Sequence, residues 1–259
     1  MTGSGPSTTA ARGLSHAWRV RLRDDAKKAN VLATAALRVN ETFASVQGEG
    51  SLIGVLSLFI RLDGCPLRCA WCDTPYALEG DRGAPTPVDD LASLADAYGH
   101  VVITGGEPLA QDIRPLVEAI GRSRHITVET SGTIFADLPQ VSLFSISPKV
   151  GSSGYTPKPA VLRKFCATAG GRMHLKFVIA GDRDLREALA CVESIRDALP
   201  AATPIILQPE SASAGRGAAY LRRLRTLAET VIADPGWRGF DVRVLPQLHY
   251  LLWDGEPGR

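Results

Sequence analysis

Short apolar runs alternate with longer amphipathic stretches over most of the chain. Seven runs dominated by Val, Ile, Leu and Phe predict buried strands, at residues 57–62, 101–104, 126–129, 143–146, 175–179, 205–207 and 242–245. Apolar residues at helical spacing predict helices, at residues 88–98, 113–120, 160–166, 185–199 and 218–232. A weaker helical pattern runs through the Ala-rich residues 31–37.

The order of these elements predicts an α/β fold. Strands that alternate with helices favour parallel βαβ units, and strands that are apolar throughout suit a sheet that is covered on its outer face. The repeats are too few for a complete eight-fold barrel, so we expect an incomplete (β/α) barrel. In such folds the active site forms at the C-terminal ends of the strands. A cysteine loop, a Gly-Gly turn and residues 129–132 all lie at such ends.

The two ends of the chain differ in character. Residues 1–35 are small, polar and charged and predict a disordered or poorly ordered extension, whereas residues 36–259 suffice for one core domain. The 29 basic and 27 acidic residues leave a net charge of +2, which indicates neither a nucleic-acid nor a membrane partner. No apolar stretch approaches the roughly 20 residues that span a bilayer, and no secretory signal is recognisable. We expect a cytoplasmic protein.

Three of the five cysteines, Cys65, Cys69 and Cys72, lie within eight residues. Thiolates at this spacing can converge on one metal centre, and a structural zinc ion would need a fourth ligand. Cys166 and Cys191 are isolated in helix-like surroundings, where free cysteine behaves as a small apolar residue. A 4Fe–4S cluster on three thiolates leaves one iron open, and S-adenosylmethionine can chelate that iron. We favour the cluster and keep zinc as the alternative.

Two motifs resemble those of the radical S-adenosylmethionine superfamily. Trp71 stands before the last cysteine, where an aromatic ring can pack beside the cluster and adenine. About one β/α unit later come Thr104, Gly105, Gly106, Glu107 and Pro108. Glycines at a strand end let the backbone approach a ligand, and the Glu107 carboxylate can accept a hydrogen bond from the methionine ammonium. The resemblance implies the incomplete barrel of that superfamily.

Further motifs resemble the 7-carboxy-7-deazaguanine synthase family over residues 38–253. They are the segments 40–43, 45–50, 59–62, 72–74, 104–108, 129–132, 147–149, 207–209 and 246–249. The family implies a radical lyase of queuosine and deazapurine biosynthesis. A deoxyadenosyl radical takes hydrogen from carbon 6 of 6-carboxy-5,6,7,8-tetrahydropterin, the ring contracts, and ammonia leaves to give 7-carboxy-7-deazaguanine. Mg²⁺, an electron donor such as flavodoxin or ferredoxin, and a homodimer are also implied.

The same resemblance assigns roles to residues. Thr74 would bind Mg²⁺ through its hydroxyl, since that ion prefers oxygen ligands. The contacts to S-adenosylmethionine would be Trp71, Asp73, Gly105, Gly106, Glu107, Ser131, Ser147, Pro148, Lys149 and Gln208. The contacts to the pterin would be Val46, Gln47, Gly48, Glu49, Arg61, Thr104 and His249. Arg61 has a physical reason as well, because a charge inside an apolar strand needs a partner and a carboxylate suits a guanidinium in bidentate geometry.

Two other functions share part of this pattern. A radical-activating enzyme of the same superfamily has the cysteine loop and the Gly-Gly turn but does not need Gln47, Glu49, Arg61 and Thr74 in this arrangement. A non-catalytic iron–sulfur protein would usually saturate its metal with four residues. The chain also departs from the family after His249, because Tyr250 follows and the sequence continues to Arg259.

Overall fold

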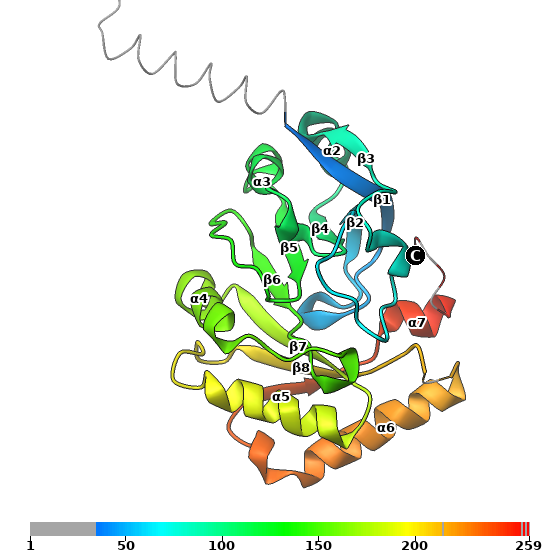
Figure 1. The fold of residues 1–259 in the computed structure, drawn as a ribbon, viewed down its shortest axis with the longest axis vertical. Coiled ribbons are helices and arrows are strands. Elements are labelled where there is room, and N and C mark those ends of the chain that lie inside the picture. The colour runs from blue at the N-terminus through cyan, green and yellow to red at the C-terminus, as the bar shows by residue number, and fades with distance from the viewer. Residues whose placement is uncertain (1–34, 214, 255, 257, 259) are drawn as a thin grey trace, which may run out of the picture.

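A nine-stranded sheet organises the chain, with strand order β3-β1-β2-β4-β5-β6-β7-β8-β9 (Figure 1). The computed structural model describes residues 35–213, 215–254, 256 and 258. The strands are β1 (Ala36–Val46), β2 (Leu56–Leu62), β3 (Ala84–Pro87), β4 (His100–Gly105), β5 (His125–Thr130), β6 (Leu143–Ile146), β7 (Met173–Ile179), β8 (Pro204–Pro209) and β9 (Asp241–Val244). The α-helices are α2 (Val88–Ala95), α3 (Arg114–Ile120), α4 (Pro159–Ala169), α5 (Asp182–Ser194), α6 (Ala218–Ala233) and α7 (Leu248–Trp253).

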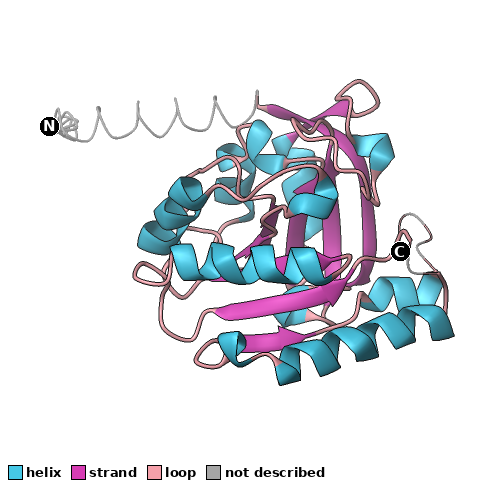
Figure 2. Ribbon diagram, turned by 60° about the horizontal axis from the view of Figure 1, so that its bottom comes forward, coloured by secondary structure: helices cyan, strands magenta, loops and turns pink. Residues whose placement is uncertain are grey.

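Seven strands, β2 and β4 to β9, run parallel to one another in the sheet. They coincide with the seven predicted apolar runs. The sheet does not close, because its edge strands β3 and β9 are not paired with each other, so the predicted incomplete barrel is confirmed. Helices α3 to α6 follow one another around the outside of the curved sheet (Figures 1 and 2).

Burial explains why these segments form strands and helices. Every residue of β7 is buried, as expected for a central strand with side chains packed on both faces. The amphipathic helix α4 directs Phe165 inward, where its ring lies 5.3 Å from that of Phe144 on β6. None of the described helices is long and apolar enough to cross a membrane.

The sequence prediction missed the two antiparallel strands at one edge. β1 carries polar residues at its centre and is only partly buried, so its apolar pattern is weak. β3 contains two prolines, which are tolerated in an edge strand. The predicted helix at 31–37 is wrong for residues 36 and 37, which begin β1. Residues 31–34, and all but Ala35 of the predicted extension at 1–35, lie outside the described residues.

Helix ends differ from prediction by a few residues. The predicted helix at 88–98 ends at Ala95, and the one predicted at 185–199 runs from Asp182 to Ser194. Helix ends are set by local hydrogen bonds that apolar spacing does not report. The strand positions, which depend on burial, are therefore the better predicted part.

A buried histidine near the start of β4 predicts acid sensitivity. His100 lies with Nδ1 2.7 Å from Ser57 Oγ and Nε2 2.8 Å from Thr127 Oγ1. Burial, helped by His125, lowers the pKa of His100 from 6.5 to about 4. The unfolded chain therefore takes up a proton at a higher pH than the folded one, and stability present above pH 6.5 is lost as the pH falls toward 4. We expect His100→Gln to remove up to about 1.4 kcal/mol per pH unit of this dependence in urea titrations.

The control for this prediction is Ser57→Ala. It removes a hydrogen bond to the ring but keeps the titrating group, so it should lower the free energy of unfolding at every pH while the slope stays. His174, whose pKa burial also lowers to about 4, should supply the remaining slope. Equal slopes in His100→Gln and the unchanged protein would contradict the prediction.

Candidate active site

A cavity of about 500 Å³ opens at the C-terminal ends of the parallel strands. It brings together most of the residues that the sequence singled out. Those that line it are Val46, Gln47, Gly48, Glu49, Arg61, Cys65, Cys69, Trp71, Cys72, Asp73, Thr74, Thr104, Gly105, Gly106, Ser131, Ser147, Lys149 and His249. Segments from β1 to α7 thus contribute to one space.

Glu107, Pro148 and Gln208 are not among the residues that line the cavity. Glu107 is buried, and its carboxylate accepts hydrogen bonds from Leu109 N at 3.2 Å, Thr130 Oγ1 at 2.7 Å and Ser131 N at 2.8 Å. The hydroxyl of Ser131 donates to it as well. In this structure the carboxylate therefore ties the turn after β4 to the end of β5, and its predicted contact with S-adenosylmethionine stays a prediction.

The three cysteines of the loop are partly exposed free thiols. Burial raises the pKa of Cys65, with Glu107 and Cys72 adding to the rise. Burial also raises the pKa of Cys69; the nearby Lys149 ammonium acts against it, and Cys72 and Cys65 add to it. All three cysteines line the same cavity. A cation beside them favours the thiolate form that binds metal.

The cysteine loop is fastened to the segment that follows β6. Ala70 N donates to Ser153 O at 3.1 Å, and Trp71 Nε1 donates to Ser152 Oγ at 2.9 Å. Lys149 Nζ lies 5.3 Å from the centre of the Trp71 ring, within the range of a cation–π contact. Ser152 N in turn donates to Asp184 Oδ1 on α5 at 3.0 Å. These contacts hold the cysteine loop in place without the help of a ligand.

At two positions the neighbouring atoms lie so close to the backbone that only glycine fits. A Cβ atom at Gly106 would lie 2.3 Å from the carbonyl oxygen of Gly64, and one at Gly48 would lie 2.1 Å from Nδ1 of His249. No side chain fits at such distances, so the Gly-Gly turn can pack against the start of the cysteine loop only without a Cβ. His249, which the sequence offered as a lone histidine, packs directly on the Gly48 backbone.

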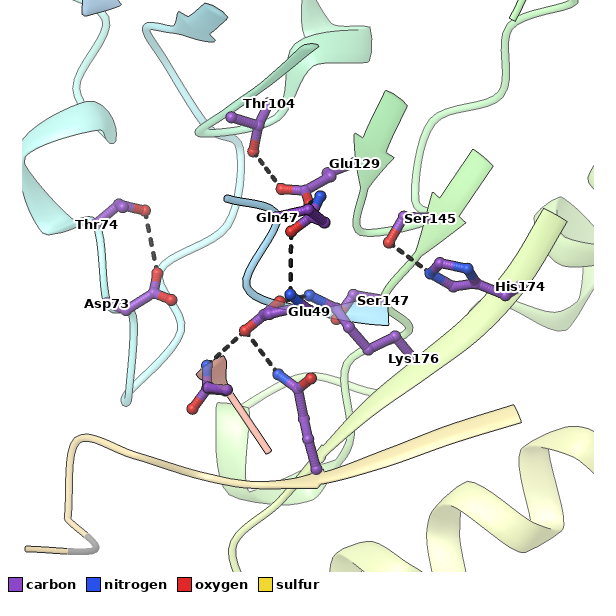
Figure 3. Close-up of polar contacts among 12 residues, drawn as sticks. Gln47, Glu49, Asp73, Thr74, Thr104, Glu129, Ser145, Ser147, His174 and Lys176 are labelled. Atoms are coloured by element: carbon purple, nitrogen blue, oxygen red, sulfur yellow. Dashed lines mark hydrogen bonds and ion pairs between the residues drawn. The ribbon is translucent and has the colours of Figure 1, made fainter. Parts of the chain in front are cut away.

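Glu49 is the centre of a polar wall in the cavity (Figure 3). Its carboxylate forms an ion pair with Lys176 and accepts hydrogen bonds from Gln208 Nε2 at 2.8 Å and Gln247 Nε2 at 2.6 Å. Lys176 is buried, and burial lowers its pKa to about 8, while the Glu49 carboxylate at its ammonium acts in the opposite direction. Gln208 supports Glu49 through this hydrogen bond, and its predicted contact with S-adenosylmethionine stays a prediction.

A second carboxylate, that of Glu129, faces the same cavity (Figure 3). Thr104 Oγ1 donates to it at 2.8 Å and Gln47 Nε2 at 3.0 Å. Both of these donors are neutral, whereas Glu49 has a cation. The wall therefore contains one carboxylate paired with an ammonium group and one that accepts from neutral donors. Together they could accept hydrogen bonds from a ligand edge that carries several N–H groups.

Lys176 and Glu129 were absent from the residues predicted to form the site. The signal for Lys176 was present, because a lysine inside the apolar run 175–179 raises the same question as Arg61 inside 57–62. Glu129 lay in a recognised motif at a strand end. What the sequence could not supply is the pairing of each charge, since the partners lie far apart along the chain.

Oxygen ligands suitable for Mg²⁺ gather at the end of the cysteine loop. Thr74 Oγ1 lies 3.3 Å from Asp73 Oδ1 (Figure 3). Asp73, Glu49 and His249 each offer a ligand atom, and these atoms lie within 4.8 Å of one another. The hydroxyl and the carboxylates fit a hard cation that keeps several waters. Burial lowers the pKa of His249, Lys176 and Arg61 lower it further, and Asp73 and Glu129 oppose them.

Comparison with known proteins gives consistent results. Residues 59–211 match the model of the radical SAM superfamily. The chain is similar to the 7-carboxy-7-deazaguanine synthase of Halobacterium salinarum, with 35% identity over 86% of this chain and 92% of that one. It is similar to that of Pyrobaculum aerophilum, with 34% identity over 88% and 99%. The crystal structure of QueE from Escherichia coli is similar with a TM-score of 0.64 and 28% identity, over 84% of this chain and 98% of that chain.

The ion pair in the polar wall predicts a large stability cost when one partner is removed. We expect Lys176→Met to lower the free energy of unfolding by about 3–5 kcal/mol, because the Glu49 carboxylate is left buried without its cation. The double variant Glu49→Gln/Lys176→Met should lose clearly less than the sum of the two single losses. Urea titration at neutral pH measures all three variants.

An exposed ion pair provides the matched control. Arg163 on α4 pairs with Asp197 at 2.7 Å but remains 40% exposed, so Arg163→Met should lower the free energy of unfolding far less than Lys176→Met does. A similarly small loss for Lys176→Met would mean that the Glu49 charge does not depend on its partner.

Proposed function

This chain belongs to the 7-carboxy-7-deazaguanine synthase family of the radical SAM superfamily, and we propose that it contracts the ring of 6-carboxy-5,6,7,8-tetrahydropterin to 7-carboxy-7-deazaguanine with loss of ammonia. One observation carries the proposal: a single cavity joins three cysteine thiols to a wall of paired charged side chains. The reaction breaks a carbon–nitrogen bond, which makes the enzyme a lyase.

The thiol end of the cavity suits the cofactors. With S-adenosylmethionine on its open iron, a 4Fe–4S cluster supplies a one-electron cleavage that yields a carbon radical able to take hydrogen from a substrate. Cys65, Cys69 and Cys72 would hold the cluster. Lys149 and Ser147, whose side chains are 3.1 Å apart in a hydrogen bond, would contact the carboxylate or ribose of S-adenosylmethionine.

The cavity's charged side chains suit the pterin. The carboxylates of Glu49 and Glu129 would accept hydrogen bonds from its guanidine-like edge. Gln47 would hold Glu49 and Glu129 at a fixed separation, because its side chain contacts both residues. Arg61 would bind the substrate carboxylate. His249 packs on Gly48 and would border the ring. These contacts orient the substrate and exclude water from it, which are the tasks left to the protein when the cofactor supplies the radical.

The oxygen ligands of Thr74 and Asp73 would hold Mg²⁺, which would supply positive charge for an anionic substrate. A one-electron donor such as flavodoxin or ferredoxin and a homodimer follow from family membership alone, so both stay predictions. The nearest alternative function, activation of a partner protein by a glycyl radical, has no use for the carboxylate pair of Glu49 and Glu129.

The decisive experiment is turnover by the reconstituted protein. The chain should be loaded anaerobically with iron and sulfide and given dithionite, S-adenosylmethionine, Mg²⁺ and 6-carboxytetrahydropterin. Mass spectrometry should find 7-carboxy-7-deazaguanine, and Cys69→Ala should abolish it because two thiolates cannot retain the cluster in the required form. Cys166→Ala, which changes a buried thiol of the core, is the matched control and should remain active.

Two other outcomes would overturn the proposal in different ways. Formation of 5′-deoxyadenosine with the pterin unchanged would leave the cofactor assignment standing and refute the substrate. Absence of both products in a protein that holds iron and sulfide would favour a non-catalytic iron–sulfur protein.

The Mg²⁺ assignment has its own test. Thr74→Ala should raise the Mg²⁺ concentration needed for half-maximal rate by about tenfold, a change that corresponds to about 1.4 kcal/mol of binding free energy. Thr74→Ser keeps the hydroxyl and should restore most of the response. An unchanged Mg²⁺ dependence in Thr74→Ala would remove Thr74 from the ion's ligands.

A further inference from the structure

We propose that Glu41 and Tyr76 are positioning residues that hold Arg61 in one orientation for a ligand carboxylate, and so determine the specificity of the cavity for a carboxylated ring. The inference rests on the proposed function, because that function supplies the carboxylate. Neither Glu41 nor Tyr76 was assigned a role from the sequence. Tyr76 lines the cavity together with Arg61.

The first observation is a shared oxygen atom. Arg61 Nε donates to Glu41 Oε1 at 2.7 Å, and the Tyr76 hydroxyl donates to the same Oε1 atom at 2.9 Å. Glu41 and Arg61 are register partners on the antiparallel strands β1 and β2, so the sheet itself sets the distance between them. The guanidinium is therefore held at its inner nitrogen by a residue that backbone pairing places directly opposite it.

The second observation concerns the faces of the guanidinium. Its carbon lies 5.6 Å from the centre of the Phe43 ring and 6.0 Å from the centre of the Tyr76 ring. Phe43 is itself stacked on Phe59, with centroids 4.9 Å apart and an interplanar angle of 2°. Rings near a planar cation limit its rotation and shield it from water. The plane of Arg61 is thus restricted as well as its Nε atom.

The third observation concerns the outer end of the Arg61 side chain. Within the described part of the chain, no hydrogen bond is made by the two terminal nitrogens of Arg61, although the side chain is only 14% exposed. Burial lowers the pKa of Arg61, but Tyr76, Glu41 and Asp73 outweigh it and raise that pKa above its usual value. A buried permanent cation with two parallel N–H groups is a receptor for a carboxylate bound end-on.

Glu41 could have the opposite effect, and the difference is measurable. If the substrate carboxylate had to displace Glu41 from Arg61, the two carboxylates would compete for the guanidinium. Removal of Glu41 would then tighten substrate binding. A positioning partner improves binding, because the ordering of Arg61 is complete before the ligand arrives. Glu41 contacts Nε, whereas an end-on carboxylate needs only the terminal nitrogens, so both partners can be accommodated at once.

Tyr76 also connects this receptor to the cysteine loop. It lies four residues after Cys72, in the 3₁₀ turn Pro75–Ala77. Asn40 Nδ2 of β1 donates to its backbone oxygen at 3.3 Å. The distance between the receptor and the thiols is therefore set by a short covalent segment that is attached to the sheet.

The test compares three substitutions by steady-state kinetics with 6-carboxytetrahydropterin. Glu41→Ala should raise KM about tenfold and leave kcat within about twofold, the pattern expected when an interaction contributes equally to the ground state and the transition state. Glu41→Gln keeps an oxygen that can accept from Nε and should restore most of the loss. Tyr76→Phe keeps the ring and loses the hydroxyl, and should fall between the two.

A binding measurement separates this inference from the proposed function and does not need a loaded cluster. Calorimetry should show that the unchanged protein binds 7-carboxy-7-deazaguanine more tightly than 7-deazaguanine, and that Glu41→Ala reduces this preference about tenfold. Glu193→Ala removes a glutamate that pairs with Arg196 on the surface and should leave the preference unchanged.

A lower KM in Glu41→Ala would show competition and overturn the inference, as would an unchanged KM and preference in a variant that folds normally by circular dichroism. If Glu41→Ala fails to fold, the same comparison of binding to 7-carboxy-7-deazaguanine and 7-deazaguanine can be made with Glu41→Gln and Tyr76→Phe. A protein that binds neither compound and produces no deazaguanine would refute the proposed function itself.

Discussion

A charged group removed from water must find a partner, and this requirement organises the cavity. Lys176 meets Glu49, and Arg61 meets Glu41, each pair joining side chains that are mostly enclosed. Among the residues that the structure describes, Glu107 has no cation as a partner and accepts hydrogen bonds from hydroxyl and backbone donors. Each pairing fixes two side chains at once. The contacts that offset the cost of burying a charge therefore also give the cavity a defined shape. The atoms that stabilise the buried charges are thus also the atoms that shape the cavity.

The two halves of the site are attached to the frame by different means. The thiol half is a loop, and it is held by hydrogen bonds to Ser152 and Ser153 and, through them, to α5. In the charged half, Arg61, Glu129 and Lys176 stand on strands, whose spacing is determined by backbone pairing, and Glu49 lies in the loop that follows β1. A loop suits a group that has to receive a large cofactor, whereas strands suit groups that must keep a fixed distance from one another. The Gly-Gly turn joins the halves at a point where no side chain fits.

Much of this architecture could be predicted from sequence, and the remainder has physical reasons. The seven parallel strands are evident as apolar runs, and the cysteine spacing with Trp71 identifies the superfamily. β1 and β3 could not be seen, because one has a polar centre and the other carries two prolines. The partners of the buried charges were also hidden. Glu49 and Lys176 are separated by 127 residues, and only the folded sheet brings them together. Lys176 itself could have been suspected from its apolar surroundings.

The polar wall joins residues that lie far apart along the chain. Gln247 and Glu49 form a hydrogen bond although they are 198 positions apart, and Leu248 N donates to Gly48 O at 2.8 Å. A nascent chain that contains the whole cysteine loop, but not yet Gln247 and Leu248, lacks these closing contacts. Contacts between distant segments form late because the intervening chain has to be ordered first. The wall is therefore completed only after residues well beyond the cysteine loop have been synthesised, so the protein acquires its thiol loop and its finished polar wall at different moments of its biogenesis.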